Sequence, residues 1–199
     1  MQPFWVDHPG LTKRLSELGA IIDEMQAESR RKYGRGMDLA ILPECAVTGE
    51  AGLKSRLRAV PLRGEFSDTF AAKARQHGCY IVAPTYLQEA DNAVSNAAVL
   101  FGRKGDIAGI DRKVHLVVSP AGRDFENGCV PRGDVPVFEC DFGKLGIQIC
   151  YDIEFDYGWS ELARKGAELI VFPTQFLSQP AKSRHRCSRL GAPSFMRWI

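Results

Sequence analysis

Three residues that can do chemistry each follow a short apolar run, at the point where a predicted strand ends. Glu44 follows "LAILP", Lys113 follows the run from Ile107 to Arg112, and Cys150 follows "LGIQI". Strands end at the edges of a rigid sheet, so side chains placed there can converge on one pocket although they lie far apart in the sequence. We therefore treat these three residues as a candidate catalytic set.

The three residue types together suit acyl transfer through a thioester. A thiol beside a cation has a lowered pKa and a larger thiolate fraction. A nearby carboxylate can accept the thiol proton and later activate water, and a fixed ammonium can stabilise the oxyanion of a tetrahedral intermediate. The same types also have simpler explanations, because a cysteine at a strand end is more often an inert buried residue. Residue types alone leave both interpretations open.

The residues around the candidate set decide between these interpretations. The segments "DLAILPECAVTGE" around Glu44, "DRKVHL" around Lys113 and "GIQICYDIEF" around Cys150 resemble the nitrilase (carbon–nitrogen hydrolase) superfamily, and they occur in the family's order. The resemblance covers roughly residues 38–175. It implies that Glu44 is the general base, Lys113 the oxyanion-stabilising cation and Cys150 the nucleophile. The backbone N–H of Tyr151 would be the second oxyanion donor.

The resemblance also implies a reaction, which is hydrolysis of a non-peptide C–N bond through a thioester on Cys150. The Cys-Tyr-Asp sequence at 150–152 is similar to the amidase-like branches: aliphatic amidases, omega-amidases and N-carbamoyl amino acid hydrolases. We therefore expect a small-molecule amide or N-carbamoyl substrate rather than a nitrile. The family implies a homo-oligomer and no organic cofactor. A metal has little support either, because the six cysteines include no C-x-x-C pair.

Three further residues near the set have weaker interpretations. Many family members carry another glutamate between the lysine and the cysteine, but the positions nearer Ala121 hold no acidic residue. Glu126 is a candidate for that role, although its place in "FENG" indicates the end of a loop and predicts an exposed side chain. His115 is interpreted as structural, and Asp152 is expected to shape the turn after the nucleophile.

The elements that must position these residues follow from apolar periodicity and turn residues. The sequence predicts helices over 10–33, 67–77 and 159–165, strands over 38–42, 79–86, 94–101, 107–113 and 168–172, and a hairpin of 135–140 with 144–150. A loop rich in Gly and Pro covers 119–134. Helices and strands alternate at both ends of the chain with a run of strands between, which predicts an α/β domain of sheets covered by helices. The resemblance implies a four-layer α-β-β-α sandwich in one domain, 1–199.

Composition and charge exclude several other classes of function. The chain has 199 residues and a formal net charge of +2, so it has no electrostatic footprint for nucleic acid beyond a basic stretch at Lys182–Arg189. No apolar run approaches the roughly 20 residues that a membrane helix needs. The N-terminal residues lack the regions of a signal peptide, so a cytoplasmic protein is predicted.

The two ends of the chain depart from the family's pattern. At the start, Gln2–Val6 is short and interrupted by Pro3, so we expect the family's first strand to be missing. At the other end, residues 176–199 are atypical and resemble no family segment, and their character fits a shifted reading frame or a truncated gene. A chain ending there is expected to leave a sheet edge uncovered. The alternative hypothesis is therefore an inactive remnant or a binding protein that keeps the first part of the fold.

Overall fold

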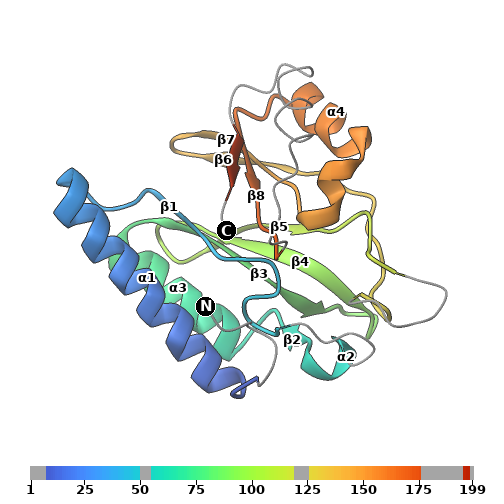
Figure 1. The fold of residues 1–199 in the computed structure, drawn as a ribbon, viewed down its shortest axis with the longest axis horizontal. Helices are drawn as coiled ribbons and strands as arrows, with labels where there is room; N and C mark the ends of the chain where they lie inside the picture. The colour runs from blue at the N-terminus through green and yellow to red at the C-terminus, as the bar shows by residue number, and fades with distance from the viewer. Residues whose placement is uncertain (1–7, 50–54, 119–125, 176–194, 198–199) are drawn as a thin grey trace.

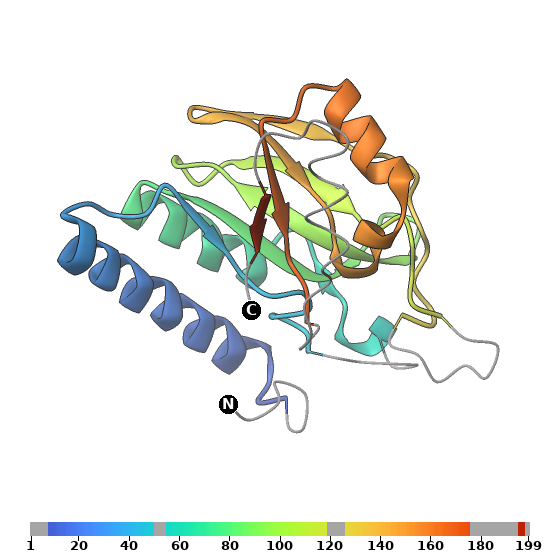
Figure 2. The same cartoon turned by 45° about the horizontal axis from the view of Figure 1, so that its top comes forward.

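Two β-sheets lie face to face, and helices cover the outer face of each (Figures 1 and 2). The computed structural model describes residues 8–49, 55–118, 126–175 and 195–197. α1 (Leu11–Tyr33) and α3 (Glu65–His77) lie side by side on the first sheet, and α4 (Asp156–Arg164) lies on the second. The layers therefore run helix, sheet, sheet, helix, which confirms the predicted α/β sandwich.

The first sheet is built around β3 (Tyr80–Gln88). β1 (Leu39–Ile41) and the short β2 (Val60–Pro61) pair with it in parallel, and β4 (Val94–Phe101) pairs with it antiparallel. β5 (Ile107–Arg112) pairs antiparallel with β4. In the second sheet β6 (Val137–Cys140) and β7 (Gly143–Ile147) form an antiparallel hairpin, followed in parallel by β8 (Leu169–Phe172) and β9 (Phe195–Arg197).

Alternation along each strand explains why the apolar runs are continuous. In β3, Ile81 and Ala83 pack toward α1 and α3, whereas Val82 packs toward the second sheet. In β8, Ile170 and Phe172 pack with α4, and Val171 joins the core between the sheets. Because successive side chains point to opposite faces and both faces are covered, most side chains on either face are apolar.

Most predicted elements are present, and their ends follow local chemistry. Gly34 and Gly78 end α1 and α3 in the left-handed conformation, with φ of 74° and 60°. The helices predicted at 67–77 and 159–165 begin earlier, at Glu65 and Asp156. The sequence analysis missed four elements because each is too short to show periodicity: α2 (Ser55–Arg58), β2, the 3₁₀ turn η2 (Cys150–Glu154) and β9.

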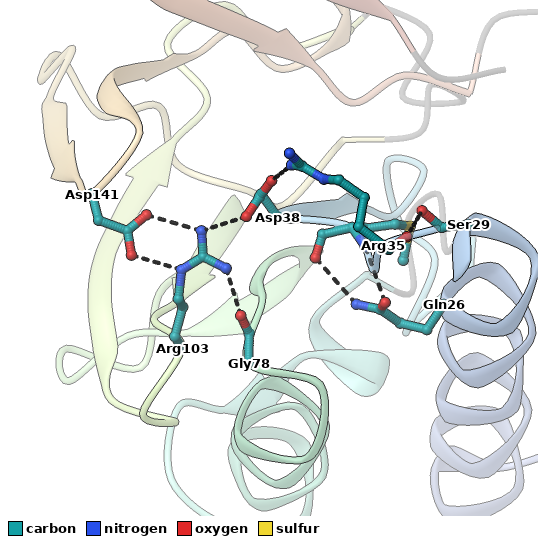
Figure 3. A network of polar contacts seen from close by, with 8 residues as sticks. Gln26, Ser29, Arg35, Asp38, Gly78, Arg103 and Asp141 are labelled. Atoms are coloured by element: carbon teal, nitrogen blue, oxygen red, sulfur yellow. Dashed lines mark hydrogen bonds and ion pairs between the residues drawn. The ribbon is translucent and has the colours of Figure 1, made fainter. Parts of the chain in front are cut away.

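Arg103, in the turn between β4 and β5, ties the two sheets together at one end of the sandwich (Figure 3). Its guanidinium donates to Asp141 in the β6–β7 turn at 2.6 and 2.9 Å. It also donates to Asp38 just before β1 at 2.8 Å and to the carbonyl of Gly78 at 2.5 Å. The hydrogen bonds from Arg103 hold the pKa of the Asp141 carboxyl below its usual range. One side chain thus fixes three turns from both sheets.

Some predictions fall outside the described residues. The missing first strand at Gln2–Val6, the loop around Ala121 and the basic stretch Lys182–Arg189 all lie there. Within the stretch 176–199 the structure describes only β9, which pairs with β8. Of the helices in the described ranges, none has the length and apolar character to cross a membrane.

The close approach of the two sheets gives a testable consequence at Gly109 of β5. A Cβ there would lie 2.2 Å from Cε1 of Phe138 on β6. We expect Gly109→Ala to lower the free energy of unfolding by about 1–3 kcal/mol, the usual cost of overpacking a core. Urea unfolding measures this value. Gly133→Ala is the control, because no heavy atom lies within 4 Å of its added Cβ. A Phe138→Leu substitution should recover part of the loss, and equal stability of both alanine variants would contradict the prediction.

Candidate active site

The centre of the candidate site is a buried ammonium between two carboxylates. Lys113, directly after β5, is 1% exposed, and its Nζ lies 2.9 Å from Oε1 of Glu44 and 3.0 Å from Oε2 of Glu126. Glu44 follows β1, and Glu126 lies on the loop between β5 and β6. A buried charge is tolerated when it is paired and hydrogen-bonded, and here one cation serves two anions. The structure therefore brings Glu44 and Lys113 together, as the sequence analysis expected.

The position of Glu126 corrects the expectation of an exposed loop residue. Its side chain is buried, with 2% of the residue exposed, and one carboxylate oxygen accepts the backbone N–H of Val117. The Glu126 N–H in turn donates to the Val117 carbonyl at 3.4 Å. The chain thus folds back on itself at this point and turns the carboxylate inward. The sequence pattern could not show this, because it depends on where the two ends of the loop meet.

Asn96 is a site residue that the sequence analysis missed. Its side-chain Nδ2 donates to Glu44 at 2.9 Å and to Glu126 at 2.5 Å, so one amide group joins the two carboxylates. Its backbone carbonyl accepts the N–H of Lys113 at 2.8 Å. A signal was present, because Asn96 is a polar residue within the fully buried strand β4. Buried amides are retained where they satisfy other polar groups.

Cys150 lies at the start of the η2 turn rather than at the end of a strand, since β7 ends at Ile147. Its backbone has φ of +48°, a conformation that is rare for a residue with a side chain and that often marks functional sites. The Cys150 N–H donates to the carbonyl of Pro173 at 3.0 Å, which anchors the turn to the end of β8. The second sheet therefore holds the thiol in a strained and defined position.

The electrostatics of the site correct a second expectation, that the cation would lower the thiol pKa. Burial raises the pKa of the Cys150 thiol, the charge of Glu44 raises it further, and Lys113 only partly offsets them. For Lys113, burial alone would lower the pKa, but Glu44, Cys150 and Glu126 outweigh it and the ammonium stays charged. Two carboxylates facing one ammonium leave the site without the excess positive charge that a resting thiolate needs.

Two groups of the site have capacity left for a reacting molecule. Oε2 of Glu44 is buried and accepts no hydrogen bond from the described residues. The backbone N–H of Tyr151, next to the thiol, has no hydrogen-bond acceptor among them either. An open carboxylate oxygen is what a general base requires, and an open N–H is what an oxyanion donor requires. The geometry thus provides an acceptor and a donor beside Cys150.

A second polar cluster lies beside the site, around a small cavity between β5, η2 and α4. The cavity is lined by apolar residues and a glycine together with six polar or charged residues: Asp111, Arg112, His115, Gln148, Asp152 and Tyr157. The Asp111 carboxyl forms no ion pair within the described ranges, and burial followed by the nearby charge of Asp152 raises its pKa well above the usual value. Oε1 of Gln148 is buried there and has no hydrogen-bond partner among the residues that the structure describes.

The described residues contain no group of three or more His, Cys, Asp or Glu side chains arranged to hold a metal ion. The five cysteines in these ranges are free thiols. Cys45 and Cys79 are buried like Cys150, whereas Cys129 and Cys140 are partly exposed. Burial and backbone conformation do not distinguish Cys150, because Cys45 is also buried and has a φ of +55°. The segment "GIQICYDIEF" around Cys150, at the start of η2, is what distinguishes it.

Comparison with known proteins identifies the family. The sequence model for "Carbon-nitrogen hydrolase" matches residues 8–190. The chain belongs to the carbon–nitrogen hydrolase family. The match extends further at both ends than residues 38–175, over which the sequence motifs resemble the family. The chain is therefore a member of a family of enzymes that hydrolyse carbon–nitrogen bonds.

Curated relatives and solved structures agree with this membership. The omega-amidase NIT2 of Danio rerio is 30% identical over 149 residues, which are 72% of this chain and 53% of the relative. A beta-ureidopropionase of Arabidopsis thaliana is 33% identical over 121 residues, 58% of this chain and 29% of the relative. The fold matches Saccharomyces cerevisiae Nit3 with a TM-score of 0.81 at 20% identity, covering 98% of this chain and 72% of that one. The chain spans about half the length of the omega-amidases it matches.

Asp111 gives a testable effect on stability. Its raised pKa means that the folded protein keeps a proton that the unfolded chain loses at a pH of about 4, so stability falls as the pH rises above that value. Asp111→Asn removes this loss, because the amide carries no ionisable proton. We therefore expect the gain in unfolding free energy over wild type to grow from pH 4 to pH 8 in urea titrations. Asp91→Asn is the control, since the pKa of this exposed carboxyl is lowered. A difference in unfolding free energy between Asp111→Asn and wild type that stays constant with pH would contradict the prediction.

Proposed function

We propose that this protein hydrolyses a small amide or N-carbamoyl compound through a thioester on Cys150. The observation that carries the proposal is the meeting of one thiol, two carboxylates and one ammonium in a buried site on a strained turn. Glu44 is the general base, Lys113 stabilises the oxyanion, and the N–H of Tyr151 is its second donor. Family membership supports the reaction class, and the site supports the assignment of roles.

The first half of the reaction forms the thioester. Because the resting thiol is neutral, Glu44 removes its proton as the sulfur attacks the carbonyl carbon of the substrate. The carbonyl oxygen gains the negative charge, which Lys113 and the N–H of Tyr151 stabilise. The C–N bond then breaks, and the nitrogen leaves as ammonia or an amine with the proton that Glu44 held. The acyl group remains bonded to the sulfur of Cys150.

The second half releases the acid and restores the enzyme. Glu44 is ionised again after the amine has left, so it can take a proton from a water molecule that attacks the thioester carbon. Lys113 again stabilises the oxyanion. The C–S bond breaks, the sulfur regains the proton from Glu44, and the carboxylic acid leaves. Water is the only co-substrate, and no oxidant or reductant is needed.

The choice of amide over nitrile rests on sequence and on the relatives. Cys-Tyr-Asp at 150–152 resembles the amidase-like branches. The relatives include omega-amidases and a beta-ureidopropionase, and an amidase from Nesterenkonia sp. AN1 with this fold carries the acetamide moiety of fluoroacetamide at its active-site cysteine (TM-score 0.70, 21% identity, covering 92% of this chain and 70% of that one). A cytoplasmic location and a homo-oligomeric state remain predictions from the sequence and its resemblance.

We propose a supporting role for Glu126. Like Glu44, it binds the Lys113 ammonium and accepts a hydrogen bond from the amide of Asn96. Burial raises the pKa of the Glu126 carboxyl, while Lys113 lowers it and Glu44 raises it. The ion pair with Glu126 keeps Lys113 charged and in place when Glu44 becomes protonated during the reaction. It binds no proton of the substrate in this scheme.

The assignment of the nucleophile is tested by Cys150→Ala. Ammonia release from small amides and N-carbamoyl amino acids should fall at least about a thousandfold, because the remaining groups supply no nucleophile. Cys140→Ala is the matched control, since this partly exposed thiol has a raised pKa of about 11 and lies outside the site. Its activity should equal that of the wild type. Turnover that persists in Cys150→Ala, or a wild type that hydrolyses neither class, would refute the proposed function.

The role of Glu126 is tested by Glu126→Gln, which keeps the shape of the side chain and removes its charge. We expect kcat to fall about tenfold to a hundredfold with little change in KM, because a slightly misplaced ammonium mainly affects the transition state. Steady-state kinetics give both constants. Glu139→Gln on the exposed face of β6 is the control and should not change them. An unchanged kcat in Glu126→Gln would show that Glu44 alone is enough to hold the lysine.

A further inference from the structure

The chain that follows Lys113 and the turn that follows Cys150 meet at one buried carboxylate. Oδ1 of Asp152 accepts the backbone N–H of His115 at 2.7 Å, and its Oδ2 accepts that of Val114 at 3.4 Å. The His115 ring contacts the same carboxylate, with Nδ1 at 3.0 Å from Oδ1. Asp152 is only 5% exposed. The first two N–H groups after the catalytic lysine are therefore held by a residue two positions after the nucleophile.

An aromatic contact strengthens the same junction. The His115 ring stacks on Phe155 with a centroid distance of 3.6 Å and an interplanar angle of 7°. Phe155 directly follows η2, and its N–H donates to the Asp152 carbonyl at 3.1 Å. The η2 turn thus holds the segment after Lys113 by a carboxylate and by a ring. Both contacts are made by the segment that follows β7 of the second sheet.

This junction matters because neither reactive group is positioned by its own sheet alone. The N–H of Lys113 is bonded to Asn96 of β4, but the chain leaves the first sheet immediately afterwards. Cys150 is anchored to the second sheet through Pro173. The distance between ammonium and thiol therefore depends on how the two sheets are joined beside them. Asp152 makes such a connection within two residues of each group, since it follows Cys150 by two positions and binds the N–H groups of Val114 and His115.

We propose that Asp152 is a positioning residue that sets the relative placement of the Lys113 ammonium and the Cys150 thiol. The catalytic part of this inference rests on the proposed function, whereas the contacts of Asp152 do not depend on which substrate binds. It goes beyond the expectation that Asp152 only shapes its own turn. Loss of the carboxylate frees the backbone at Val114 and His115, and the ammonium then moves away from the sulfur. The ammonium then stabilises the thiolate less, and the chemical step becomes slower.

The experiment compares five variants of the full chain: Asp152→Ala, Asp152→Asn, His115→Ala, Lys113→Met and the double variant Asp152→Ala/Lys113→Met. Asp152→Asn keeps one acceptor oxygen, and His115→Ala keeps the backbone N–H while it removes the ring. Asp111→Asn is the matched control, because it changes a buried acid of the same cavity that binds neither N–H group. The readouts are kcat and KM for amide hydrolysis, and the rate at which iodoacetamide alkylates Cys150 at pH 8, measured on its peptide by mass spectrometry.

If Asp152 positions the two groups, Asp152→Ala lowers kcat about a hundredfold with KM within about threefold, as expected for misplacement of a reacting group. Asp152→Asn and His115→Ala lower kcat by less than Asp152→Ala does. Alkylation of Cys150 slows in Asp152→Ala as it does in Lys113→Met, and the double variant is no slower than Lys113→Met. Asp111→Asn matches the wild type in both readouts.

A merely structural role gives a different pattern. Asp152→Ala would then melt at a lower temperature while its folded fraction keeps the wild-type kcat and alkylation rate, and that result would overturn the proposal. Additive slowing in the double variant would also overturn it. If Asp152→Ala does not fold, Asp152→Asn decides, because unchanged alkylation there refutes the role and slower alkylation supports it. If the wild type hydrolyses no amide, the proposed function fails, whereas the alkylation comparison still tests the position of Lys113.

Discussion

Burial of the Lys113 ammonium is the constraint on which the arrangement of the site depends. Removing an ion from water costs several kcal/mol even in a relaxed protein interior, so the charge must be matched by anions in good geometry. Glu44 and Glu126 supply them, and Asn96 donates a hydrogen bond to each carboxylate. The segments after β1, after β5 and from the following loop must therefore reach one point. Loss of any of these partners removes a hydrogen bond from a buried charged group of the site.

The same charge balance determines how the thiol is activated. Two carboxylates beside one ammonium disfavour a thiolate, and burial disfavours it further, so the pKa of the Cys150 thiol is raised. A site of this kind differs from one in which a cation holds a preformed thiolate. The thiol must lose its proton to a base during attack, and Glu44 has an open oxygen for that purpose. The carboxylate that balances the lysine is thus also the group that moves the proton.

The sandwich supplies the reactive groups from both of its sheets. Glu44 and Lys113 belong to the edge of the first sheet, and Cys150 belongs to the turn after β7 in the second. The close approach of the sheets, seen where Gly109 faces Phe138, allows these edges to meet. Arg103 joins the sheets at one end and Asp152 joins them beside the site. Stability of the interface between the sheets and precision of the site are therefore two aspects of one packing arrangement.

The sequence by itself determined the family, the order of the reactive residues and the longer helices and strands, because motifs and periodicity are local properties. It placed Glu44, Lys113 and Cys150 after apolar runs, and the structure brings them together. Only the tertiary structure decided that Glu126 is buried, that Asn96 joins the carboxylates and that the thiol pKa is raised. These properties depend on desolvation and on contacts between segments far apart in the chain. A loop residue has no periodicity to show its direction, and a pKa depends on neighbours that only folding provides.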